Sequence, residues 1–216
     1  MELELEKLSI MLLDPTLTDQ QLTDELLFLK DFSIHSIFVL PCNVARAKQL
    51  LTETRIRIGS FTDFPLGGGT LAKKAFETGK LYREGASEVF VAMTPDQLTF
   101  GGHQSYQTLA PLAFGHDGLG FFIDSSQLNE YQKQQLTIDL AKMENIKFMS
   151  IGLDLSMKEA LYDMSIFRSG AKNQRMFQVN VKAPTLLEME LLFQAGASRI
   201  GLSNGREILP LISKWD

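Results

Sequence analysis

The sequence predicts an α/β fold, a single closed (β/α)8 barrel of the TIM type over residues 1–216. Apolar, β-branched stretches alternate with helix-patterned stretches eight times along the chain, which is typical of parallel strands joined by crossover helices. The hydrophobic share of 44% and the charged share of 22% are those of an ordinary globular domain. No linker or low-complexity tract divides the chain, so we expect one domain. An open doubly wound sheet remains the structural alternative, because periodicity does not establish closure.

The expected strands are short runs rich in Ile, Val, Leu and Phe, the residue types that favour a pleated, buried environment. They cover residues 8–14, 34–41, 56–64, 88–93, 118–124, 146–154, 177–183 and 199–203. His35 lies among apolar neighbours in the second strand, where we expect a histidine packed in the core rather than a catalytic one.

The expected helices follow the strands and begin at recognisable signals. They cover residues 19–29, 43–54, 71–84, 127–143, 157–169, 185–194 and 206–213. Thr18 and Ser156 precede two of them as N-caps, and Pro184 is placed where a missing N–H in a first helical turn costs nothing. Residues 94–115 are less regular, and the pair Gly101-Gly102 predicts a long loop there before a weak helix.

Polar residues follow most of the expected strands, and in a barrel the carboxyl ends of the strands form the mouth that carries active sites. They are Asp14, Thr16, Cys42, Asn43, Thr62, Asp63, Thr94, Asp96, Asp124, Ser125, Asp154, Lys182, Ser203 and Asn204. Each aspartate, serine or threonine is individually explained as well by helix capping. Lys182 shares one strand face with Gln178 and Asn180, so it is either a catalytic amine or the partner of a carboxylate such as Asp124.

The segment Gly201-Leu202-Ser203-Asn204-Gly205 leads from the last strand into the last helix. Backbone N–H groups at a helix start, with small residues that allow close approach, predict a phosphate site. The alternative is that the glycines serve only the geometry of the turn.

Composition limits the possible partners and location. A net charge of −5 without a cluster of basic residues argues against nucleic acid as a partner. No apolar run approaches the roughly 18 residues of a membrane span, and the N-terminus shows no secretory signal. The single Cys42 agrees with a reducing compartment, so we expect a cytoplasmic protein. Separately, we expect no cofactor.

Six segments together resemble the deoxyribose-phosphate aldolase family in order and spacing. They are Asp14-Pro15-Thr16, Phe64-Pro65-Leu66-Gly67, Lys74 with Glu77, the run from Glu84 to Val89, Val181-Lys182-Ala183, and the run from Ala195 to Gly201. The resemblance implies a class I aldolase that cleaves 2-deoxyribose 5-phosphate to glyceraldehyde 3-phosphate and acetaldehyde on a TIM barrel. It also implies one lysine that forms an imine, a second lysine that perturbs the first, and an aspartate in the proton relay.

Two of these roles fall on residues that cannot fulfil them. The resemblance places the second lysine on Lys182, but it places the imine lysine on Met149 or Ser150 and the relay aspartate on Phe90. Methionine, serine and phenylalanine supply neither the amine nor the acid that the reaction needs. The resemblance therefore implies a divergent relative, and whether this chain is an enzyme stays open.

Three hypotheses follow. The first is an altered aldolase acting on a phosphorylated sugar or an aldehyde, with Lys182 as the amine, Asp14 or Asp124 as proton carrier, and Thr16, Gly201, Ser203, Asn204 and Gly205 around the phosphate. The second is a pseudoenzyme that binds a sugar phosphate without turnover. The third is a barrel enzyme that holds a divalent metal ion with Asp14, Asp63, Asp124 and Asp154. The family resemblance also suggests a homodimer.

Overall fold

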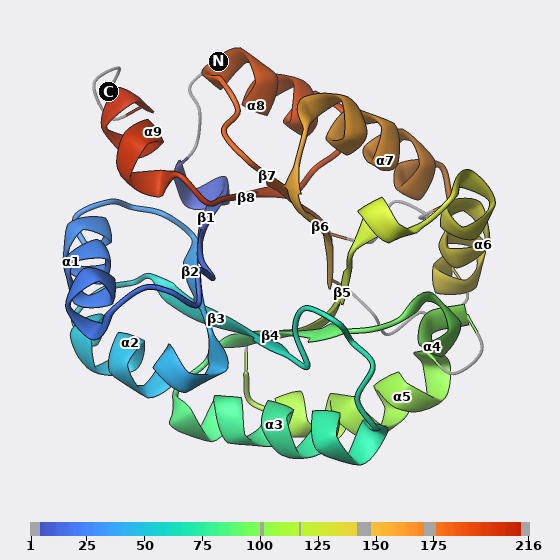
Figure 1. Ribbon diagram of the computed structural model, residues 1–216, viewed down its shortest axis with the longest axis horizontal. Coiled ribbons are helices and arrows are strands. Elements are labelled where there is room, and N and C mark those ends of the chain that lie inside the picture. Colours follow the sequence, from blue (N-terminus) through green and yellow to red (C-terminus); the bar gives the residue numbers. More distant parts are fainter. Residues whose placement is uncertain (1–4, 100–101, 117, 142–147, 171–175, 213–216) are drawn as a thin grey trace.

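The computed structural model confirms the closed barrel that the sequence predicts (Figure 1). The strands pair in sequence order, all in parallel, and β8 returns to β1. The structure describes residues 5–99, 102–116, 118–141, 148–170 and 176–212. The strands are β1 (Leu8–Leu12), β2 (Ser36–Val39), β3 (Arg57–Thr62), β4 (Glu88–Ala92), β5 (Gly118–Ile123), β6 (Phe148–Leu155), β7 (Met176–Val181) and β8 (Arg199–Leu202).

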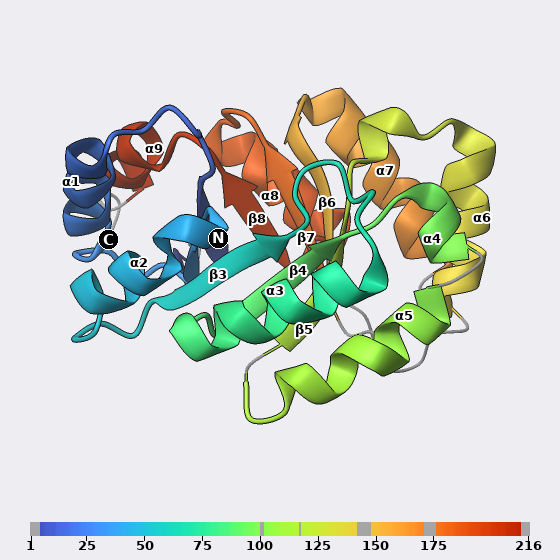
Figure 2. The ribbon, with the colours of Figure 1, turned by 60° about the horizontal axis from the view of Figure 1, so that its bottom comes forward.

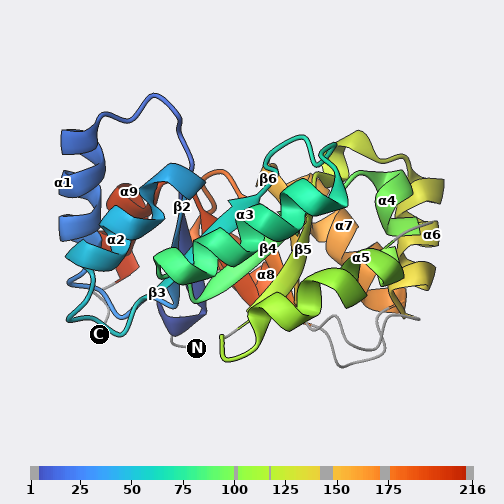
Figure 3. The same cartoon turned by 90° about the horizontal axis from the view of Figure 1, so that it is seen from below.

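The helices form a ring outside the strands, as the views in Figures 1 and 2 show. They are α1 (Asp19–Leu29), α2 (Val44–Leu50), α3 (Leu71–Glu84), α4 (Pro95–Thr99), α5 (Gly102–Leu109), α6 (Glu130–Ala141), α7 (Met157–Gly170), α8 (Leu186–Gln194) and α9 (Gly205–Ile212). Short 3-10 turns are η1 (Leu5–Lys7), η2 (Pro41–Asn43), η3 (Ala110–Ala113) and η4 (Ser125–Gln127). In Figure 3, α2, α3 and α5 lie across the outer side of β3 to β5. Within the described residues, no helix is long and apolar enough to cross a membrane.

Local capping explains why several helices begin where the sequence predicts. Thr18 caps α1 in a reciprocal capping box with Gln21, and Ser156 exchanges the same pair of hydrogen bonds with Glu159 at the start of α7. The helix after Pro184 begins one residue later than predicted. Thr185 is the N-cap of α8, and the helix begins at Leu186, so the proline lies before the helix rather than in its first turn.

The segment between β4 and β5 is more helical than the sequence predicts. Residues 94–115 contain α4, α5 and η3 in place of one long loop and one weak helix. Each of these pieces is short, so none carries the extended apolar periodicity that sequence reasoning depends on.

Two separate apolar clusters divide the core. The larger one joins strand residues to helix residues such as Leu22 and Leu26 of α1, so it fills the layer between sheet and helices. The smaller cluster consists of strand residues alone and fills the inside of the barrel: Met11, Phe38, Phe61, Phe90, Ala92 and Phe122. Phe64, from the loop after β3, packs onto this cluster with its ring 4.9 Å from Phe61 and 5.4 Å from Phe122. The barrel is therefore plugged by aromatic rings on the side of β2 to β5.

Charged residues also lie within the barrel. Glu88 of β4 and Arg199 of β8 are both buried and form a two-pronged ion pair, with one prong of 2.8 Å from Arg199 Nη1 to Glu88 Oε2. Half-buried His35 lies beside them. Burial and the charge of Arg199 lower the pKa of His35 to about 4, so its ring is neutral near pH 7. His35 therefore lies just before β2 and beside charged groups, rather than among apolar side chains of the core as the sequence predicts.

Strand β6 carries an irregularity that the sequence does not predict. Ile151 pairs with Val179 and Leu155 with Val181, so residues 152–154 bulge opposite Asn180 alone. The buried Asn180 amide donates to Ser150 Oγ at 2.9 Å and to the Gly152 carbonyl at 2.7 Å. These hydrogen bonds attach the bulge to β7.

Candidate functional site

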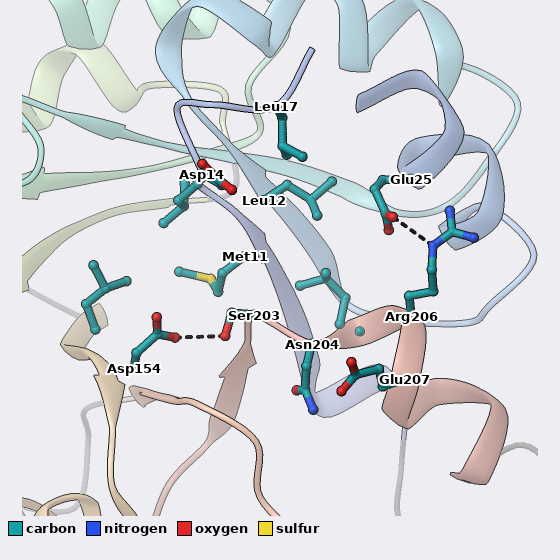
Figure 4. Close-up of a pocket in the computed structure, with 14 residues that line it drawn as sticks. Met11, Leu12, Asp14, Leu17, Glu25, Asp154, Ser203, Asn204, Arg206 and Glu207 are labelled. Carbon is teal, nitrogen blue, oxygen red and sulfur yellow. Dashed lines mark hydrogen bonds and ion pairs between the residues drawn. The ribbon is translucent and has the colours of Figure 1, made fainter. Parts of the chain in front are cut away.

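The mouth of the barrel contains a cavity of about 630 Å³ beside β1, β6 and β8 (Figure 4). Its walls combine aliphatic and charged side chains: Ile10, Met11, Leu12, Leu13, Asp14, Leu17, Glu25, Leu153, Asp154, Ser203, Asn204, Gly205, Arg206 and Glu207. Four of these residues are acidic and one is basic, and the basic Arg206 pairs with Glu25 at 2.7 Å. The cavity therefore presents an excess of negative charge.

The sequence-predicted residues Asp14 and Thr16 are held together in one turn at the rim. Asp14 Oδ1 accepts from the Thr16 backbone at 2.8 Å and from the Thr16 hydroxyl at 2.7 Å. The Thr16 side chain and then its backbone hold the pKa of Asp14 below its usual range. Asp14 is therefore ionised and weakly basic, and the hydroxyl donor predicted for phosphate is already in use.

The predicted phosphate turn after β8 shows the same pattern. Ser203 Oγ donates to Asp154 Oδ1 at 2.8 Å, across 49 positions of sequence (Figure 4). The two neighbouring glycines have packing reasons to be glycine. A Cβ on Gly205 would come 2.8 Å from a carbon of Ile10, and a Cβ on Gly201 would overlap the side-chain oxygen of Asn180.

Lys182 follows β7 by one residue and is exposed. Its backbone N–H donates to Leu155 at 3.2 Å, but in the described chain its amine has no hydrogen bond or ion pair. The ion pair with Asp124 that was one expectation is not formed. Asp124 Oδ1 accepts from the Ser126 backbone and hydroxyl. Lys182 does not line the cavity beside β1, β6 and β8.

The residues that the resemblance assigns to the relay aspartate and the imine lysine lie in different layers. Phe90 is fully buried inside the barrel, with its ring 5.4 Å from that of Phe38. Met149 points outward into the layer between sheet and helices, so the inward-facing alternative on β6 is Ser150, which accepts the hydrogen bond from Asn180.

The acidic residues do not gather into a metal centre. Asp63 accepts from the Gly69 backbone and from Lys73 at 2.7 Å. Burial alone would raise the pKa of Asp63, but its hydrogen bonds from Lys73 and Gly69 outweigh burial and lower it. Within the described residues, no group of three or more His, Cys, Asp or Glu side chains could hold a metal ion.

One important residue was not recognised as such from the sequence. Lys74 of α3 is 1% exposed, and its ammonium donates to the carbonyls of Gly67 and Ala92 and to Gln97 Oε1 at 2.6 to 2.7 Å. Burial lowers the pKa of Lys74. Together with Asp63 it anchors the loop that lays Phe64 over the aromatic plug. Its sequence signal was only a lysine at helical spacing before a glutamate.

Comparisons with known proteins agree with this architecture. The chain matches no family model. It is 26% identical over 184 residues to a deoxyribose-phosphate aldolase of Clostridium kluyveri, covering 83% of this chain and 84% of that protein. A solved aldolase superposes with a TM-score of 0.83 at 17% identity, covering 98% of both chains. The deoxyribose-phosphate aldolase of Aeropyrum pernix, described as a tetramer, gives 0.83 at 14% identity and covers 98% of this chain and 92% of its own. The structural matches establish the TIM-barrel fold, and the sequence match over most of the chain supports kinship with the deoxyribose-phosphate aldolases.

Proposed function

We propose that this chain is a divergent deoxyribose-phosphate aldolase homologue that binds a small ligand in its mouth cavity and has lost imine chemistry on β6. The observation that carries the proposal is the inward face of β4 and β6. There the described residues at the family positions are Phe90 and Ser150, both fully buried. A class I aldolase needs an amine to form the imine and a group to move protons, and these side chains offer neither.

The aromatic plug on the side of β2 to β5 is a second reason against aldol cleavage, because its rings occupy that half of the mouth. A carbonyl substrate would have to displace the rings of Phe61, Phe64 and Phe122, which pack within 5.4 Å of one another. Among the described residues, a cavity lies instead on the side of β1, β6 and β8. Binding without aldol cleavage is thus the function that the geometry supports best.

A second candidate is an aldolase that uses Lys182 as its only amine. One specific observation favours it: the exposed Lys182 amine lies at a strand end and has no partner in the described chain. Because Lys182 does not line the cavity beside β1, β6 and β8, the substrate carbonyl would have to bind at another part of the mouth to reach this amine. This candidate predicts an imine between the substrate carbonyl and Lys182, which can be trapped by reduction.

The test is mass spectrometry after incubation with 2-deoxyribose 5-phosphate, and separately acetaldehyde, with cyanoborohydride. Lys182→Met serves as the site control, and exposed Lys158 of α7 reports non-specific labelling. We expect no more adduct on Lys182 than on Lys158, and no cleavage of the sugar phosphate in a coupled assay. A selective adduct on Lys182, with cleavage that the Lys182→Met variant loses, would refute the proposal and establish the second candidate.

A further inference from the structure

The sequence assigns two hydroxyl groups at the mouth to phosphate, that of Ser203 on the cavity wall and that of Thr16 beside it, and each donates its proton to an aspartate that lines the cavity. Thr16 donates to Asp14 in a local turn, whereas Ser203 donates to Asp154 from another strand. A hydroxyl has one proton to donate, so neither can donate to a bound phosphate without breaking its present hydrogen bond. The second contact is the more informative, because nothing in the local sequence requires it.

The placement of Asp154 depends on the bulge in β6. Residues 152–154 stand opposite Asn180 alone, and Gly152 and Asp154 have φ values of 65° and 51°. The Asn180 amide fixes the bulge through the carbonyl of Gly152 at 2.7 Å. The bulge turns the Asp154 carboxylate toward the loop after β8, where it accepts from Ser203 (Figure 4).

Electrostatics strengthens the effect of this contact. The carboxylate of Asp154 lies on a cavity wall that also carries Asp14 and Glu207, while Arg206 on the same wall is paired with Glu25. A phosphate monoester has up to two negative charges near pH 7, and like charges in a partly enclosed site repel one another strongly. The cavity that should bind phosphate by family resemblance is therefore unfavourable to it.

We infer that Asp154 is a specificity-determining residue: its carboxylate occupies the turn after β8 in place of a substrate phosphate and restricts the mouth to ligands without a phosphate group. This rests on the proposed function in one respect, namely that the mouth cavity is the ligand site. The aliphatic walls from Leu12, Leu17 and Leu153, with carboxylates at the rim, suit a small uncharged or cationic molecule with hydroxyl or amino groups.

Two substitutions separate the charge of Asp154 from its hydrogen bond. Asp154→Asn keeps an oxygen that can accept from Ser203 and removes only the charge. Asp154→Gly removes the side chain and frees the Ser203 hydroxyl. Asparagine and glycine both tolerate the positive φ at this position, so neither variant should strain the bulge. Asp31→Asn is the matched control, because it removes one exposed carboxylate near His35 and Arg57, outside the mouth cavity.

The experiment is isothermal titration calorimetry with inorganic phosphate at fixed low ionic strength, on the wild-type chain and the three variants. Circular dichroism checks that each variant is folded. We expect at least about tenfold tighter phosphate binding in Asp154→Asn or Asp154→Gly than in the wild type and in Asp31→Asn. A gain in the glycine variant alone would assign the effect to the freed hydroxyl and would still support the inference.

The inference is overturned if neither Asp154 variant binds phosphate more tightly than Asp31→Asn, including the case in which none of them binds it. It is also overturned if the wild type already binds phosphate as tightly as both Asp154 variants. Inorganic phosphate has no carbonyl and forms no imine, so these outcomes do not depend on the trapping experiment with Lys182. Failure here would leave the loss of aldol chemistry intact, and an imine on Lys182 would leave the role of Asp154 intact.

Discussion

The aromatic plug gives a prediction that can be worked out from distances. A Cβ added at Gly59 of β3 would lie 2.5 Å from Cζ and 2.6 Å from Cδ1 of Phe38, against an ordinary contact of 3.4 to 4 Å. The Phe38 ring would have to shift by roughly 1 Å, and Phe90 and Phe61 at centroid distances of 5.4 and 5.3 Å oppose that shift. We expect Gly59→Ala to destabilise the fold by about 2 kcal/mol through overpacking.

A double-mutant cycle isolates this clash. Phe38→Val should cost about 3 kcal/mol alone, and it removes the Cδ1, Cε1 and Cζ atoms that a Cβ at position 59 would meet. The double variant should then cost little more than Phe38→Val, which leaves an interaction energy of about −2 kcal/mol. Urea denaturation followed by circular dichroism measures the four stabilities, and Gly68→Ala, with open space around its Cβ, is the control. Additive costs within about 0.5 kcal/mol would refute the packing of this plug.

Three further predictions concern buried charges. His35 binds a proton more readily in the unfolded chain than in the folded one, so the free energy of unfolding should fall as the pH drops from 6.5 to 4. Allowing for the partial exposure of the ring, we expect a loss of about 2 kcal/mol. In denaturation measured at several pH values, the His35→Gln variant should lack this part of the loss. Lys74→Met leaves two buried carbonyls without their donor and should cost about 2 to 3 kcal/mol in the same assay, whereas Lys73→Met, at an exposed side chain, should cost less than about 1 kcal/mol. Glu88→Gln leaves the buried Arg199 charge without its counter-ion and should cost about 3 to 5 kcal/mol in urea denaturation. A shift of the denaturation midpoint worth less than about 1 kcal/mol would contradict the described ion pair.

Much of the fold could be predicted because its signals are local. The bounds of α1 and α3 agree with the predicted residues 19–29 and 71–84, since Thr18 and Thr70 supply N-caps and Gly85 ends α3 with a φ of 112°. The predicted ends of the strands were less accurate. The predicted first strand ran to residue 14, but pairing ends at Leu12, because β-propensity does not indicate where neighbouring strands separate.

The candidate site was predictable only in part. The sequence placed Asp14, Lys182 and Ser203 at the mouth of the barrel, and the structure has all three after their strands. It did not predict which of them meet. Lys182 lies outside the cavity that Asp14 and Ser203 share, and the Asp154 that binds Ser203 was only one of several capping candidates.

The sequence by itself determined the alternation of strands and helices and the caps of several helices, because residue type and spacing along the chain suffice for these. Only the tertiary structure decided closure of the barrel, the plug of rings on one side of the mouth, and the contact of Asp154 with Ser203. These depend on strand register, and the three-residue bulge opposite Asn180 shifts that register where no local pattern marks it. Such shifts in register fix contacts between distant residues, including the contact between Asp154 and Ser203, which are 49 positions apart. The sequence alone therefore did not predict which residues meet at the mouth of the barrel.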